Sequence, residues 1–159
     1  MPLLLRYQHL KGEKIVGGCS LSGFEDWIEL RSLEFEGGRK VAMTHDGSGL
    51  RGENLPFLTE VVVTKRCDRS SPLLFLAALQ GGEGDIEVVL SAGTVGESRI
   101  AFVFRTARIA TYRIQLEDSK EVERLAIVYA SFDMTYRERS EVGNETTNVS
   151  VAYEWSRAK

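Results

Sequence analysis

Apolar and polar residues alternate along most of this chain, which is the pattern of half-buried β-strands. Two of the alternating segments, 98–114 and 122–137, are apolar on both faces for part of their length. A surface strand should have one solvated face, so either another molecule covers these strands or a bent strand is shared by two sheets of one barrel. The pattern predicts a mainly β fold, with strands in segments 57–66, 85–91, 98–114, 122–137 and 149–155.

A single short helix is predicted at residues 71–80. Ser71 is a favourable N-cap, Pro72 suits the first helical position, and Gly81 with Gly82 supplies the stop. The apolar residues run almost all the way round the helix axis, and a helix that is apolar on all sides needs cover on all sides. One sheet covers only half of it, so the other half should contact a further element or another subunit.

Residues 36–56 form a long connection with five glycines and a proline. Connections of this length are uncommon in compact domains and are usually functional or disordered. We therefore expect one domain, 1–159, with a long extended loop at 36–56.

Charge and hydropathy exclude several classes of partner. With 20 basic and 23 acidic residues, the net charge of −3 gives no reason to expect nucleic acid or an anionic membrane. No apolar stretch approaches the roughly 20 residues that a membrane span needs, so no membrane insertion is expected. The opening residues are too short for a signal peptide, which predicts synthesis in the cytoplasm and, if the protein is exported, export without a cleavable signal.

Catalysis, cofactors and metals are not expected. Residues 44–48, Thr-His-Asp-Gly-Ser, contain the types of a catalytic triad, but triad members normally converge from distant positions on a rigid scaffold. Cys67 lies beside Arg66 and Arg69, which would lower its pKa, yet no histidine is near it in sequence. Two histidines and two scattered cysteines offer no metal-ligand spacing.

Four motifs in register resemble one known family. Residues 63–74, VTKRCDRSSPLL, resemble the signature of the haemolysin-coregulated proteins, the tube-forming subunits of type VI secretion. Lys11-Gly12-Glu13, the stretch 27–30 (WIEL) and the closing strand 151–155 resemble further motifs of that family. The resemblance extends from about residue 3 to residue 155.

The resemblance implies a two-sheet β-barrel with one helix, and a homo-hexameric ring that stacks into the inner tube of a contractile machine. It further implies sheath and spike proteins as partners, and small effectors carried in the lumen. Glu34 would face the lumen, where a small polar residue is common in the family. The helix residues expected in core and ring packing are Leu73, Leu74, Phe75 and Leu76, and those expected at the stacking loop are Arg39, Lys40, Val41, Met43, His45 and Leu50.

Two alternatives remain from the sequence alone. A phage-tail-type tube protein would share the barrel, although residues 68–72 favour the secretion family. A small ligand-binding β-barrel module, or a small barrel enzyme, would use the 44–48 loop or a barrel cavity. The mass in solution separates these classes, because only a ring predicts a particle about six times 17.8 kDa.

Overall fold

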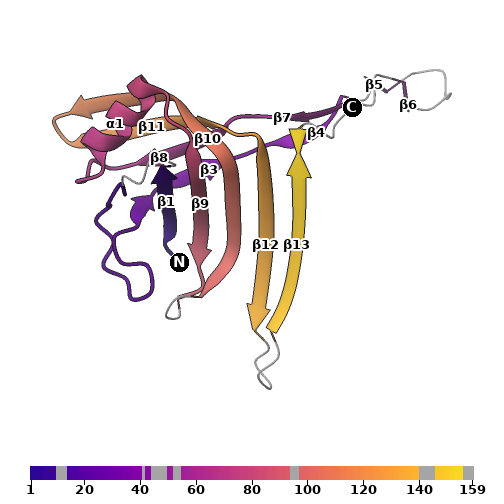
Figure 1. Cartoon of the computed structure of the whole chain (residues 1–159), viewed down its shortest axis with the longest axis horizontal. Coiled ribbons are helices and arrows are strands. Elements are labelled where there is room, and N and C mark those ends of the chain that lie inside the picture. Colours follow the sequence, from indigo (N-terminus) through magenta and orange to yellow (C-terminus); the bar gives the residue numbers. More distant parts are fainter. Residues whose placement is uncertain are drawn as a thin grey trace.

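The computed structural model describes residues 1–9, 14–40, 42–43, 50–51, 55–93, 97–139 and 146–155, and it is mainly β with one helix (Figure 1). Both features were predicted from the sequence and are confirmed. The elements are β1 (Leu3–His9), β2 (Ile28–Leu30), β3 (Ser32–Glu34), β4 (Gly37–Arg39), β5 (Ala42–Met43), β6 (Leu50–Arg51), β7 (Pro56–Leu58), β8 (Val61–Lys65), α1 (Ser71–Gln80), β9 (Gly84–Ser91), β10 (Ser98–Glu117), β11 (Lys120–Val128), β12 (Ser131–Arg139) and β13 (Thr146–Glu154).

Nine of the strands form one antiparallel sheet in the order β2-β1-β9-β10-β11-β8-β3, with β12 paired to β10 and β13 paired to β12. The two ends of the main path, β2 and β3, are joined by Arg31 and do not pair with each other. Among the described residues the sheet is therefore not closed into a hydrogen-bonded barrel. The expectation of a barrel is corrected in this respect, and β13 is an edge strand.

Strand β10 is bent, and the bend explains its two apolar faces. Its first half pairs with β9 and β12, whereas residues from Arg108 onward pair with β11. The register with β9 shifts between Phe104 and Ala107, and Thr106 between them has a positive φ of 52°. The strand therefore belongs to two parts of the sheet, as one of the two sequence interpretations required.

The predicted strand at 122–137 is two strands, and the prediction of one strand was wrong. The chain turns at Tyr129 and Ala130, so that β11 and β12 both pair with β10, one on each side of its bend. The amide of Ala130 donates to the carbonyl of Arg105 at 3.0 Å. The turn lies inside an unbroken apolar pattern, so the alternation of side chains leaves no trace of it.

The main core lies on the inner face of the sheet. It joins side chains of β1, β8, β9, β10 and β11 to Leu74 and Ala77 of α1. At its margin the ring of Phe35 meets the rings of Phe102, Phe104 and Phe132 edge-on, with centroids 5.2 to 6.1 Å apart. A second, smaller cluster lies on the other face of the sheet, where Cys19, Phe24 and Trp27 cover Leu4 and Val89.

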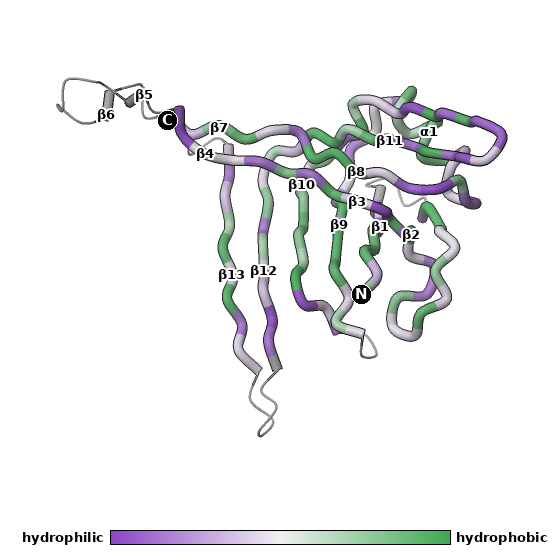
Figure 2. The backbone as a smooth tube through the Cα atoms, turned by 180° about the vertical axis from the view of Figure 1, so that it is seen from behind, coloured by the Kyte–Doolittle hydropathy of each residue, from purple (hydrophilic) through white to green (hydrophobic). Residues whose placement is uncertain are grey.

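The described part of the segment predicted as a long loop contains short strands, and we call it the arm. Strand β4 pairs with β7, and β5 pairs with β6, so both pairs are antiparallel and out of the main sheet. Figures 1 and 2 both show the β4–β7 pair running away from the body of the molecule. The expectation of an extended segment holds, with two-stranded pairing added to it.

Candidate assembly surface

The start of helix α1 is fixed by a buried network of charged and hydroxyl side chains. Lys65 Nζ lies 3.0 Å from Oδ1 of Asp68 and donates to Ser71 Oγ at 3.1 Å. Lys65 also forms an ion pair with Glu123 of β11, and Ser71 Oγ donates to Oε2 of Glu123 at 3.0 Å. Lys65 and Glu123 are fully buried, so each charge depends on the other for its stability.

The residue that caps the helix is Ser70, not Ser71 as the sequence suggested. Ser70 makes no side-chain cap hydrogen bond within the helix; its amide and its hydroxyl both donate to Oδ1 of Asp68. Ser71 is the first helical residue, and its hydroxyl accepts the amide hydrogen of Asp68 at 3.0 Å. At the other end Gly81 adopts φ of 68°, the left-handed stop that two glycines predicted.

These contacts give the 63–74 motif a physical meaning. Its lysine, aspartate and second serine bind one another and tie the helix to β8 and β11, so the motif is structural. Sequence reasoning missed Glu123, which lies 58 residues from Lys65 and carries no local signal in an ordinary strand pattern.

The pKa of Cys67 is raised, whereas its neighbours in sequence predicted a lowered one. Burial raises its pKa, and the carboxylates of Glu123 and Glu121 raise it further. Arg69, which was expected to lower this pKa, is turned away: its Nε donates to the carbonyl of Gly17 at 2.6 Å, and it pairs with Asp26. Burial, and then the Glu123 carboxylate, likewise raise the pKa of Tyr112.

One side of helix α1 is uncovered by the rest of the described chain. Leu74 is 1% exposed and belongs to the core, whereas Leu73, Phe75 and Leu76 are each 40% to 44% exposed and Leu79 is 72% exposed. Phe75 keeps one edge-on contact with Tyr112, at a centroid distance of 5.3 Å. We call the exposed residues Leu73, Phe75, Leu76 and Leu79 the helix patch. The expectation that the sheet covers only half of the helix agrees with this burial.

A second uncovered apolar surface lies on β12 and β13. The register pairs Phe132 with Tyr153, Met134 with Val151 and Tyr136 with Val149. Phe132 packs on the core, so by alternation the others share its face and continue the core side of the sheet outward. Val149 and Val151 are 58% and 57% exposed, and Tyr136 is 37% exposed. We call Met134, Tyr136, Val149 and Val151 the hairpin patch.

The remaining predicted residues lie on the arm and on β3. Arg39 and Lys40 are exposed at the base of the arm, and Glu34 is exposed on β3, where it pairs with Val62. Met43 and Leu50 lie in the short β5–β6 pair. Val41, His45 and the 44–48 cluster lie outside the described residues.

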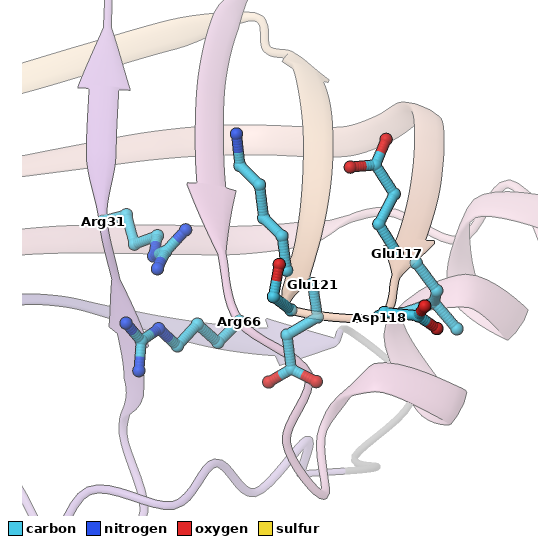
Figure 3. A pocket seen from close by; sticks show the side chains of 8 residues that line it. Arg31, Arg66, Glu117, Asp118 and Glu121 are labelled. Atoms are coloured by element: carbon cyan, nitrogen blue, oxygen red, sulfur yellow. The ribbon is translucent and has the colours of Figure 1, made fainter.

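The described part of the chain contains no group of histidine, cysteine or acidic residues that could hold a metal ion. A polar hollow at the β10–β11 turn is lined by Arg31 and Arg66 on one side and by Glu117 and Asp118 on the other (Figure 3). Its charged groups are exposed and of both signs, which is not the environment that tunes a general acid or base. Among the described residues no helix is long and apolar enough to cross a membrane, and α1, the one helix described, has 10 residues.

An antiparallel sheet with a free edge, one half-covered helix and two uncovered apolar patches defines a class of protein that offers surfaces to other protein chains. The family described as "Type VI secretion system effector, Hcp" matches residues 7–136, which is most of the chain. The chain belongs to this family, whose members are structural, secreted tube proteins of type VI secretion. No curated protein sequence matches the chain.

Solved structures of Hcp proteins share the fold. A structure described as a type six secretion system protein superposes with a TM-score of 0.83 at 16% identity, covering 99% of this chain and 98% of its own. Hcp1 from Salmonella typhimurium superposes with a TM-score of 0.70 at 17% identity, covering 100% of this chain and 99% of its own. A doubly substituted Hcp1 from E. coli EAEC 042 superposes with a TM-score of 0.69 at 19% identity, covering 94% of this chain and 97% of its own.

Proposed function

We propose that the protein is a ring-forming subunit of the type VI inner tube, with six copies to a ring and small effectors carried in the lumen. The observation that carries this proposal is the pair of uncovered apolar surfaces, the helix patch and the hairpin patch. Large exposed apolar patches on a soluble chain mark protein contacts. Family membership supplies the kind of assembly.

The placement of the two patches suits a ring. Helix α1 lies over the β10–β11 end of the sheet and the β12–β13 hairpin lies at the other end, in both views (Figures 1 and 2). Two different surfaces on one chain support a head-to-tail contact, in which each subunit offers one patch to each neighbour. Such a contact closes into a ring when the rotation between neighbours closes.

The arm serves the stacking of rings in this proposal. It leaves the body of the subunit, so it can reach a neighbouring ring without disturbing the core. We assign stacking to Arg39, Lys40, Val41, Met43, His45 and Leu50, and we place Glu34 toward the lumen. Exposed ion pairs contribute only about 0–1 kcal/mol each, so a stack held by Arg39 and Lys40 should loosen in salt.

The wider role follows from the family. Sheath and spike proteins of the machine are the further partners we propose, and export through the machine would need no cleavable signal peptide. The subunit works without catalysis or a cofactor. A phage-tail-type tube protein is the second candidate, because the free edge and the two patches would serve that assembly equally well.

A charge placed in the hairpin patch tests the proposal. Sedimentation of the wild-type protein should show a particle of about six times 17.8 kDa that is annular in negative stain. Val151→Lys, in the patch, should shift the protein toward the single subunit, because burying an unpaired charge is costly. The matched control is Asn148→Lys, an exposed position on the opposite face of the same strand.

The two results separate the candidate classes. A wild-type protein of 17.8 kDa at every concentration would contradict the ring and favour a ligand-binding module. If the Val151→Lys variant still forms the ring, the proposed ring stands, but the hairpin patch is not part of its subunit contact.

A further inference from the structure

The outer face of the sheet carries a group of arginines that form no ion pair among the described residues. Arg113 of β10 and Arg124 of β11 are directly opposite each other in the register, and both are exposed. Their neighbours in sequence, Tyr112 and Leu125, point to the core side, so the two arginines point away from it. Like charges placed directly opposite across two strands are destabilising, so this pair works against the fold.

Two further arginines extend this group across the sheet. Thr64 of β8 pairs with Arg124, and the carbonyl of Thr64 accepts the backbone amide of Arg31 at 2.7 Å. Arg66 directly follows β8, and Arg66 and Arg31 line the same hollow (Figure 3). We call Arg31, Arg66, Arg113 and Arg124 the arginine face.

No carboxylate of the described residues forms an ion pair with Arg113 or Arg124, whereas Arg31 and Arg66 share their hollow with Glu117, Asp118 and Glu121 (Figure 3). None of the four arginines forms an ion pair within the described residues, whereas Arg6, Arg69, Arg105 and Arg108 each have one. Glu117 lies four residues beyond Arg113, or about 13 Å along the strand, and Glu34 lies on β3, two strands or about 10 Å from Arg124. Both separations reach or exceed the screening length of about 8 Å at physiological salt.

We propose that the arginine face binds an acidic polypeptide segment, and that effectors with an exposed cluster of carboxylates are the cargo this subunit selects. The cargo part of the inference rests on the proposed function, which places this face, like Glu34, toward the lumen. Charge complementarity identifies the partner: Arg113 and Arg124 lie directly opposite each other with no ion pair among the described residues, on a chain whose net charge is −3. Guanidinium groups bind carboxylates through paired hydrogen bonds.

A nucleic acid fits this face less well than a polypeptide does. The carboxylates of Glu34 and Glu117 flank the arginines and would repel a continuous phosphate backbone that crossed the face. The outward positions beside the arginines are taken by Ser32, Thr64, Gln115 and Val122, which offer no aromatic ring for a base to stack on.

Binding of a dye-labelled poly-glutamate peptide, followed by fluorescence anisotropy at low salt, tests the proposal. The wild-type protein should bind the peptide, and the affinity should fall as salt is added. Arg113→Gln with Arg124→Gln should raise the Kd by about tenfold or more, because two charge-assisted contacts are lost. The control, Arg99→Gln with Arg137→Gln, replaces two exposed arginines elsewhere on the sheet that have no ion pair within the described ranges, and it should leave the Kd unchanged.

Four outcomes decide the matter, with the mass of each sample measured in parallel. Equal binding by the Arg113→Gln/Arg124→Gln variant and the wild type would overturn the proposal, as would stronger binding of single-stranded oligothymidylate than of poly-glutamate. A ring that does not bind the peptide overturns the cargo inference alone. Peptide binding by a 17.8 kDa subunit overturns the ring and leaves the arginine face standing. Thermal unfolding should show the variant at least as stable as the wild type, since it removes a like-charge pair.

Discussion

The two ends of the sheet share the same alternation of apolar and polar residues, but their apolar faces are covered differently. At the α1 end, β10 and β11 are covered by Leu74 and Ala77 of the helix, and a buried ion pair fixes the helix there. At the other end, β12 and β13 present the continuation of the same core face with nothing of the described chain over it. The comparison teaches that an apolar strand face is completed by the chain's own helix at one end and, in our account, by a neighbouring copy at the other.

The largest expected effect breaks the α1 end. Glu123→Leu removes one partner of the buried pair and leaves the Lys65 ammonium without compensation, which should lower the free energy of unfolding by about 3–5 kcal/mol. Urea unfolding of the variant measures this loss. The control is Lys65→Met combined with Glu123→Leu, which should recover most of the stability because no buried charge remains. If Glu123→Leu alone were as stable as the wild type, the buried network would not be what holds the helix.

The helix itself offers a sharper comparison between its two sides. Leu74→Ala should lower the free energy of unfolding by about 2–5 kcal/mol, because it leaves a cavity in the core. Leu79→Ala, at a side chain that is 72% exposed, should change it by at most about 0.5 kcal/mol. Leu79→Ala should instead weaken association in sedimentation. Equal losses of stability at both positions would contradict the division of the helix into a core side and a contact side.

The hairpin patch should behave like the outer side of the helix. Val149→Ser should leave the unfolding of the subunit within about 0.5 kcal/mol, since Val149 is more than half exposed in the isolated chain. The same substitution should make assembly weaker, with dissociation of the particle at higher protein concentration than in the wild type. A large loss of subunit stability without a change in assembly would mean that the chain itself covers this face.

The smallest effect concerns Tyr129, where the two ends of the sheet meet. Its hydroxyl donates to the carbonyl of Thr59 at 3.0 Å, and burial raises its pKa from 10.0 to about 12. The folded state therefore favours the neutral phenol, and this contribution is complete below pH 10 and is lost as the pH rises to about 12. Between pH 10 and about pH 12, the free energy of unfolding should fall less for Tyr129→Phe than for the wild type.

The sequence predicted the elements better than it predicted their partners. Period-2 alternation located β9, β10 and β13, and the proline and two glycines located α1, because these are local signals. The same alternation merged β7 with β8 in segment 57–66 and β11 with β12 in segment 122–137. A bent strand was one of two interpretations left open for segment 98–114, and the turn at Tyr129 was missed, since the alternating apolar pattern continues through it. A closed barrel was expected by resemblance, whereas the strand order leaves β13 as a free edge.

The candidate surface was predicted in part. The half-covered helix followed from its all-round apolar composition, and the structure adds that Leu74 alone of the four selected residues is in the core. The hairpin patch and the arginine face were missed, because both depend on which residues lie opposite each other across strands. The strand register is what places Arg113 beside Arg124 and Val149 beside Tyr136, and the sequence alone does not give it.

The central claim is that neighbouring copies cover the helix patch and the hairpin patch. Hydroxyl-radical footprinting at protein concentrations below and above the onset of association measures this directly. The account predicts that Leu79 and Val151 become protected together as the mass rises toward about six times 17.8 kDa. Both side chains remaining fully reactive in the assembled particle, or a mass that never leaves that of one subunit, would contradict it.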